Sequence, residues 1–392
     1  VSTATLALSF DASKGEAWSL TSRIDGLSRG GLAAQSADLT ANGQIAADAG
    51  RITGKVETKL AALSLSDPAL ATAIGPNPAA RFAFDWIEGA PLAFSDILAS
   101  SQGAALSGAL TVTGPLEELS LPPDLSLIAL DLSRFSALAN TPLSGSANLA
   151  VQGAAQPLSG AFDLAFSGGT RNLALAQPRL DTLLEGDGEL TLHVSRDLGG
   201  TYIRAFDIHT AHAAITAKGA LKTNASALTA TAEITETARV LPALQGPSRV
   251  SVTALQGENG WQLRGNGSGP GATELSLNAA FPDAPDGLRP LSVDATLTAA
   301  NIAPFSQLLG QPASGGLSLT LTAEGDLTTR SGSANLALNG QSLRIGPAAL
   351  APLFGATQTL TAALKLEEGH LRIESADLAT PDEAALARGL EV

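Results

Sequence analysis

Four histidines are the side chains of this sequence best suited to metal binding or proton transfer. His209 and His212, in the segment DIHTAH, have the three-residue spacing with which a helix presents two metal ligands on one face. The segment alternates like a strand, however, and residues three apart on a strand face opposite sides. His193 and His370 stand alone, and the chain has neither Cys nor an HExxH motif. The sequence therefore favours polar histidines at a sheet edge, with no metal site.

The residue combinations of common enzyme active sites are also absent. The sequence contains no GxSxG nucleophile elbow and no phosphate-binding GxxxxGK[ST] loop. Residues 265–271, GNGSGPG, lack the lysine of such a loop and do not lead into a helix, so we expect an ordinary loop. Carboxylates cluster in turns, where they are solvated caps far more often than acid–base pairs. Asp187 and Asp197 lie in predicted loops, but no calcium-binding nonapeptide recurs. We expect neither an enzyme nor a cofactor.

The length and charge of the chain narrow the remaining classes of function. Its 392 residues suffice for two ordinary domains or for one elongated repeat structure. The formal net charge is −14, from 37 acidic and 23 basic residues, and no three basic residues are adjacent. No nucleic-acid partner is expected, because phosphate binding requires clustered Lys and Arg.

The apolar composition is unusual in kind. Apolar residues make up 44% of the chain, with only 11 Phe, three Trp and one Tyr, so aliphatic side chains dominate. Such a sequence forms wide aliphatic surfaces rather than compact aromatic centres. No run of about 18 apolar residues occurs, so no segment is predicted to cross a membrane as a helix. Methionine is absent even at position 1, which indicates a processed or excised piece of a longer chain.

Alternation of apolar and polar residues is the dominant pattern, and it predicts strands with one apolar face. We expect about twenty such strands, joined by short Gly, Asn and Asp turns into antiparallel hairpins. The predicted fold class is all-β: an elongated, curled antiparallel β-sheet that forms a groove, with a few short helices. The side chains predicted to line the groove are Leu149, Val151, Phe162, Leu164, Phe166, Leu190, Leu192, Val194, Leu275, Leu277, Phe281, Leu317, Leu319, Leu321, Leu336 and Leu338.

Short helical segments interrupt the strands at intervals that repeat. They begin near residues 68, 134, 179, 238, 304 and 349, and Phe135, Pro142 and Gly145 have identical counterparts 170 residues later. We therefore predict a partial β-repeat unit at residues 1–66 and two β-groove repeat units at 67–236 and 237–378. A further helical segment is predicted to start at 379–392, where TPDEAALARGL carries helix-capping signals.

One aromatic cluster departs from the aliphatic pattern. RFAFDWIEG, residues 81–89, presents Phe82, Phe84 and Trp86 on one side of a predicted strand. A tight local core beneath the preceding helix is the favoured interpretation. A bulky constriction of the groove is the functional alternative.

The short helices are too few to cover the apolar faces of so many strands. Two helical turns cover a patch about 10 Å wide and 10 Å long, whereas twenty strands form a sheet on the order of 100 Å long. The apolar face must therefore pack on another sheet, close into a solenoid or stay open as a groove. An open aliphatic groove would aggregate or bind apolar molecules, and acyl chains suit it because they need no specific hydrogen bonds.

The combined pattern resembles the TamB/AsmA-like translocation and assembly proteins of Gram-negative bacteria. The resemblance rests on short LxxLxG helical turns, Ser-Gly breaks and alternating strands such as ITAKGAL at 215–221 and LKLEEGHLRIESADL at 364–378. It implies a periplasmic protein, anchored in the inner membrane, that conducts phospholipid between the inner and outer membranes in an apolar β-groove. It also implies support of outer-membrane protein assembly, with an Omp85-type barrel as partner through parts of the protein outside these residues.

A structural role is the main alternative: a β-solenoid passenger or adhesin whose apolar face is a sealed, dry core. The alternation of residues is the same in both cases. The solenoid predicts parallel coils of about 20–30 residues, whereas the groove predicts antiparallel strands in units of about 170 residues. Bound lipid would also separate the two.

Overall fold

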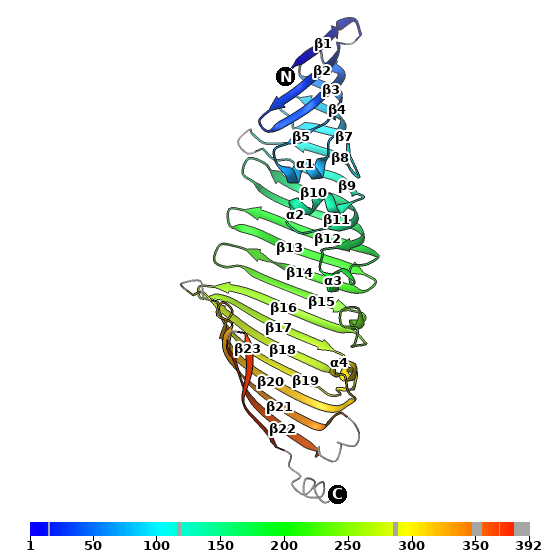
Figure 1. Ribbon diagram of the computed structural model, residues 1–392. Helices are drawn as coiled ribbons and strands as arrows, with labels where there is room; N and C mark the ends of the chain where they lie inside the picture. Colours follow the sequence, from blue (N-terminus) through cyan, green and yellow to red (C-terminus); the bar gives the residue numbers. More distant parts are fainter. Residues whose placement is uncertain (15, 116–118, 285–288, 347–354, 368, 380–392) are drawn as a thin grey trace, which may run out of the picture. The chain divides into compact units, whose positions relative to one another are not determined.

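The computed structural model describes residues 1–14, 16–115, 119–284, 289–346, 355–367 and 369–379. Strands account for 67% of the chain and helices for 9%, and the strands form an antiparallel sheet that is not closed. The predicted class, an all-β curled antiparallel sheet with a few short helices, is confirmed (Figure 1). The chain divides into two compact units, Val1–Ala211 and His212–Val392.

The first unit is built from strands, with short helical turns between some of them. Its strands are β1 (Thr3–Asp11), β2 (Ala17–Arg29), β3 (Leu32–Ile45), β4 (Arg51–Ala61), β5 (Ser64–Leu65), β6 (Ala79–Ile87), β7 (Leu92–Ser101), β8 (Ala104–Val112), β9 (Pro123–Ala129), β10 (Ser144–Gln156), β11 (Ala161–Ala174), β12 (Asp187–Asp197) and β13 (Gly200–Thr210). Its α-helices are α1 (Pro68–Ile74), α2 (Ser136–Ala139) and α3 (Pro178–Asp181), and its 3₁₀ helices are η1 (Ala12–Lys14) and η3 (Leu132–Phe135).

The second unit has the same construction. Its strands are β14 (Ala213–Leu221), β15 (Ala227–Ile234), β16 (Ser248–Gly257), β17 (Gly260–Gly269), β18 (Thr273–Pro282), β19 (Pro290–Ala299), β20 (Ala313–Asp326), β21 (Ser331–Ile345), β22 (Thr357–Glu367) and β23 (His370–Ala379). Its helical turns are η4 (Thr237–Arg239), η6 (Ala303–Phe305) and α4 (Ser306–Leu309).

Both units are antiparallel meanders, in which a strand pairs with its neighbour along the chain. The exception is β5, a two-residue strand that pairs with the start of β3, while β4 pairs with β6. Consecutive antiparallel pairing follows from the short turns between alternating segments. It places the apolar residues of neighbouring strands on the same side of the sheet wherever the turn keeps the register.

The prediction of a loop at residues 265–271 is wrong, because β17 continues to Gly269. Gly265 and Gly267 stand opposite Leu277 and Leu275 of β18. A Cβ atom at position 265 would lie 3.5 Å from the Leu277 Cβ, so the leucine side chains cover the space above the glycines. Pairing with β16 and β18 holds this glycine-rich segment extended, against its local preference.

The short helices form where the sequence predicts them. Asp67 caps α1 by accepting hydrogen bonds from the amides of Ala69 and Leu70, and Pro68 takes the first helical position. The segments predicted near residues 134, 179, 238 and 304 are η3 with α2, α3, η4, and η6 with α4. The segment predicted near residue 349 and the C-terminal helix from Thr380 lie outside the described residues.

The 170-residue offset of the sequence is also present in the structure. The bounds of α2 and α4 differ by 170, as do those of β12 and β22. The Ser136 hydroxyl accepts a hydrogen bond from the Leu143 amide at 2.9 Å, and the Ser306 hydroxyl accepts one from the Ala313 amide at 3.0 Å. The same local contacts therefore recur in both units. The repeat boundaries at 67–236 and 237–378 stay predictions.

Two glycines beside α4 provide a test of this repeated turn. Gly315 has a φ of 89°, and a Cβ atom there would lie 2.2 Å from the Ser342 carbonyl oxygen; Gly310 has a φ of 68° with open space around it. We expect Gly310→Ala to cost about 1 kcal/mol through backbone strain alone, and Gly315→Ala at least about 2 kcal/mol more. Urea unfolding followed by circular dichroism measures both. Equal losses would contradict the close approach at Gly315.

Candidate functional site

In the first unit, the strand register places the predicted lining residues on one face of the sheet. Val151 stands opposite Phe166 on the neighbouring strand, and Phe166 stands opposite Leu192. Leu164 stands opposite Val194 in the same way. The alternation along each strand then brings Leu149, Phe162 and Leu190 to that face as well.

In the second unit, the predicted residues also share one face. Leu319 stands opposite Leu297 on β19 and Leu338 on β21, and Leu338 stands opposite Leu360 on β22. Leu275 joins the same row, because it stands opposite Leu297. The remaining predicted residues, Leu277, Phe281, Leu317, Leu321 and Leu336, alternate with these along their strands. Each unit therefore carries a continuous apolar face.

The apolar faces are only partly buried. None of the predicted lining side chains falls in the buried class, and Leu275 is 42% exposed. Among the described residues, Ile208 is the one large side chain that is less than 2% exposed. The apolar faces are thus accessible to an apolar ligand.

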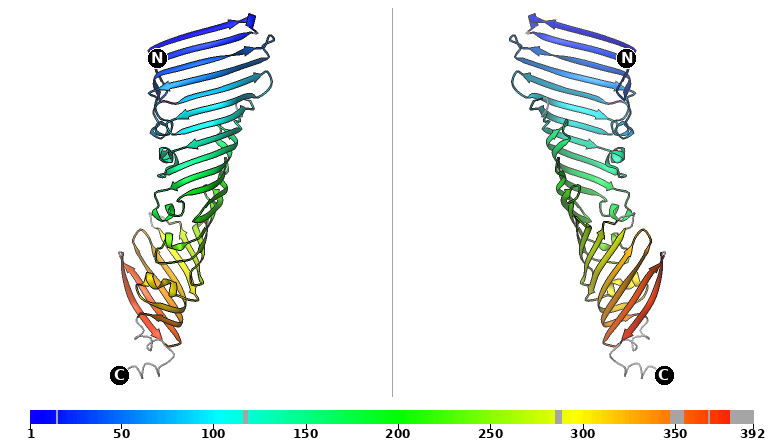
Figure 2. Two further views of the ribbon diagram at one scale, coloured as in Figure 1. Left: turned by 90° about the vertical axis from the view of Figure 1, so that its right-hand side faces the viewer. Right: turned by 90° about the vertical axis from the view of Figure 1, so that its left-hand side faces the viewer.

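The helical turns cover the apolar face at the strand ends. Ile302, beside η6, packs with Ala299, Ala313 and Leu343 in a buried cluster, against which Phe305 also packs. In the first unit Leu183 and Leu184, which follow α3, are buried. Figure 2 shows the helical turns of each unit along one edge of its strands. They close one margin of the face and leave the middle of the strands uncovered.

The predicted aromatic residues Phe82, Phe84 and Trp86 alternate on β6 and share the apolar face of the first unit. The Phe84 ring lies 6.2 Å from that of Trp18, and the Phe82 ring meets that of Phe94 edge-on at 5.5 Å. These contacts make a local aromatic core, and a constriction of the groove stays a prediction.

The partners of this aromatic cluster, Trp18 and Phe94, are not predicted by the pattern of residues 81–89. Gly54 is the residue of the sequence that could have indicated the contact between Trp18 and Phe84. A Cβ atom at this position would lie 2.5 Å from the Phe84 ring and 2.7 Å from the Trp18 ring. The glycine makes room for the two rings to lie over the β4 backbone. Trp261 stands opposite Phe281 on the apolar face of the second unit. All three tryptophans of the chain therefore lie on apolar faces.

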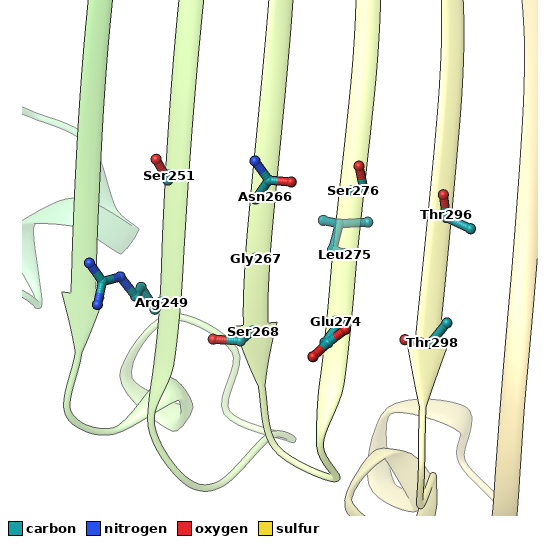
Figure 3. Close-up of a pocket in the computed structure, with 10 residues that line it drawn as sticks. All are labelled: Arg249, Ser251, Asn266, Gly267, Ser268, Glu274, Leu275, Ser276, Thr296 and Thr298. Atoms are coloured by element: carbon teal, nitrogen blue, oxygen red, sulfur yellow. The ribbon is translucent and has the colours of Figure 1, made fainter.

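The opposite face of each unit is mostly polar. Its ion pairs include Arg51 with Asp85 at 2.7 Å and Arg249 with Glu233 at 2.9 Å. The hydrogen bond from Arg51 lowers the pKa of the Asp85 carboxyl, which stays ionised and solvated. In the second unit this face has a hollow of about 400 Å³, and Figure 3 shows the polar side chains that cross it from strand to strand: Ser251, Asn266, Ser276 and Thr296.

The histidines lie among these polar groups. His193 Nε2 is 2.5 Å from Asp163 Oδ1, and His209 Nε2 is 2.7 Å from Asp207 Oδ1. The Ser195 hydroxyl accepts a hydrogen bond from Arg204 at 2.9 Å. A nucleophilic triad places its histidine between the hydroxyl and the carboxylate. Here Arg204, and not His193, is the hydrogen-bond donor to Ser195, so the arrangement differs from a triad. In the part of the chain that the structure describes, no three His, Asp or Glu side chains are grouped as metal ligands.

Comparison with protein-family models, with curated proteins and with solved structures finds no match for this chain. Within the described residues, no helix is both long enough and apolar enough to span a membrane. The candidate site therefore follows from geometry alone. It is the half-exposed apolar face of each unit.

Two residues on the apolar face of the first unit test whether that face is open. Leu192 is partly exposed, whereas Ile208, on the neighbouring strand, is almost fully buried. We expect Ile208→Asp to lower the free energy of unfolding by at least about 4 kcal/mol, because it buries a charge. Leu192→Asp should cost only about 1–2 kcal/mol, because water reaches the new carboxylate. Denaturant unfolding measures both, and equally severe losses would indicate a sealed core.

Proposed function

We propose that the apolar faces bind the acyl chains of phospholipids and that the protein conducts phospholipid between the inner and outer membranes. The observation that carries this proposal is the continuity of each apolar face together with its partial exposure. An exposed apolar surface of this extent marks an interaction site. Acyl chains match it, because a mainly aliphatic face offers apolar contact and few specific hydrogen bonds, at about 0.8 kcal/mol for each CH₂ group buried.

The rest of the proposed role depends on the resemblance to TamB/AsmA-like proteins. In that role the protein works in the periplasm, is anchored to the inner membrane in its full-length form, and supports outer-membrane protein assembly. An Omp85-type barrel would be its partner. The segments that carry the resemblance include ITAKGAL in β14 and LKLEEGHLRIESADL in β22 and β23, which are paired strands of the second unit.

Two observations favour this proposal over the structural solenoid. The described strands pair antiparallel, whereas a solenoid of short coils pairs its strands in parallel. The lining side chains are also more exposed than those of a dry core, where most large apolar residues are fully buried.

Lipid extraction with mass spectrometry tests the proposal directly. The chain, purified gently from bacterial periplasm, should carry phospholipid in stoichiometric amount, and Leu192→Asp and Leu319→Asp should each lose most of it. The matched controls are Thr191→Asp and Thr320→Asp, which place the same charge one residue away, on the polar face. His193→Ala should also retain lipid. A stable, lipid-free wild-type protein would contradict the proposal and support the solenoid.

The tryptophans offer a second test that locates the bound chains. Phospholipid with brominated acyl chains should quench the fluorescence of Trp18, Trp86 and Trp261, because all three lie on apolar faces. The same lipid without bromine serves as the control. Quenching by bromine on the head group alone, with none from acyl-chain bromine, would place the lipid on the polar face and overturn the proposal.

A further inference from the structure

The apolar face of the second unit contains a discrete hollow of about 560 Å³ near the turn between β20 and β21. This volume lies within the range of small-molecule binding pockets. Six aliphatic residues make the apolar part of its wall: Leu291, Ala323, Ala334, Leu364, Leu366 and Leu371. Polar residues, Ser331 and Ser333 among them, line the rest. All six aliphatic residues come from the strands β19 to β23 of this unit, and the register places them on the apolar face.

The hollow exists because two strands carry small residues at its centre. Gly325 stands opposite Gly332, and the next pair on this face is Ala323 with Ala334. In the first unit, 170 residues earlier, the positions of Gly332 and Ala334 are occupied by the larger residues Phe162 and Leu164, on the same face. The hollow therefore lies where two β21 positions of the second unit carry smaller residues than their counterparts in the first.

A cation stands at the end of this hollow. Arg330, in the β20–β21 turn, lines the hollow, and the residue 170 positions earlier is Gly160. Arg330 has a φ of 51°, a left-handed conformation that favours glycine, so the arginine is kept at a cost in backbone strain. Among the described residues, no carboxylate forms an ion pair with its guanidinium.

Two acidic residues, Glu324 and Asp326, also line the hollow, and among the described residues neither forms an ion pair with this arginine. The Asp326 carboxylate accepts hydrogen bonds from the amides of Arg289, Thr328 and Thr329 at 2.8–2.9 Å, which lower its pKa. Glu324 stands opposite Ser333, on the polar face. The guanidinium thus keeps its hydrogen-bond donors available for a ligand.

We propose that this hollow holds an acyl chain of a phospholipid while Arg330 binds the lipid phosphate. The planar guanidinium donates two parallel hydrogen bonds to a phosphate, and an aliphatic hollow beside it suits the chain of the same molecule. The inference rests on the proposed function, and it adds a defined resting site on a face that otherwise offers only apolar contact.

Two soluble probes that differ only in the phosphate test this site: dioctanoyl phosphatidic acid and dioctanoylglycerol. The 392-residue chain is titrated with each by tryptophan fluorescence or calorimetry. Arg330→Gln should weaken phosphatidic acid binding about tenfold or more and change dioctanoylglycerol binding less than twofold. Arg344→Gln, the same change on an exposed residue of the polar face of β21, should alter neither.

A second variant tests the hollow itself. Ala334→Leu introduces the residue that the first unit carries at this register, so it should fold, and thermal unfolding verifies this. By filling the hollow it should weaken both probes about tenfold. If Ala334→Leu changes neither probe, or if Arg330→Gln weakens both equally or neither, the inference is overturned while lipid binding stands. If the wild-type chain binds neither probe, the proposed function fails as well.

Discussion

The register of antiparallel pairing is the constraint on which the apolar faces depend. Side chains alternate along a strand with a period of two, so a slip of one residue would exchange Val151 for Gln152 on the apolar face. Short turns and ladder hydrogen bonds fix the register in most places. Where a strand is irregular, as between His193 and Val194, the partner strand takes an extra residue, and Ile203 and Phe206 both stay on the apolar side. The continuity of each apolar face therefore depends on the pairing of many strands and not on any single residue.

The sequence determines strand identity and facing because both are local. Alternation along the chain was enough to predict which side chains share one face of each unit, and the Asp-Pro pair at 67–68 was enough to place α1. The glycine-rich segment at 265–271 shows the limit of local reasoning, since its extended form comes from β16 and β18 on either side. Local preference there points to a loop, and tertiary pairing overrides it.

Contacts across strands could not be predicted from one sequence. The Trp18 ring meets the Phe84 ring because β2, β3, β4 and β6 are neighbours in that order, and because Gly54 leaves space between them. The hollow beside Arg330 likewise depends on Gly325 and Gly332 standing opposite each other. Alternation alone assigns Gly325 and Gly332 to the apolar face, as it would assign a leucine. It therefore predicts a continuous apolar surface and gives no indication of the hollow.

Consecutive pairing has a consequence for how the protein acquires its structure. Each strand pairs with residues only a few tens of positions away, so the loss of entropy on loop closure is small. A strand can therefore pair before distant parts of the chain are available. Structure can then grow by addition of one strand at a time, in the order in which the chain emerges from the ribosome. A chain of this construction can begin to fold before its last residue has been delivered.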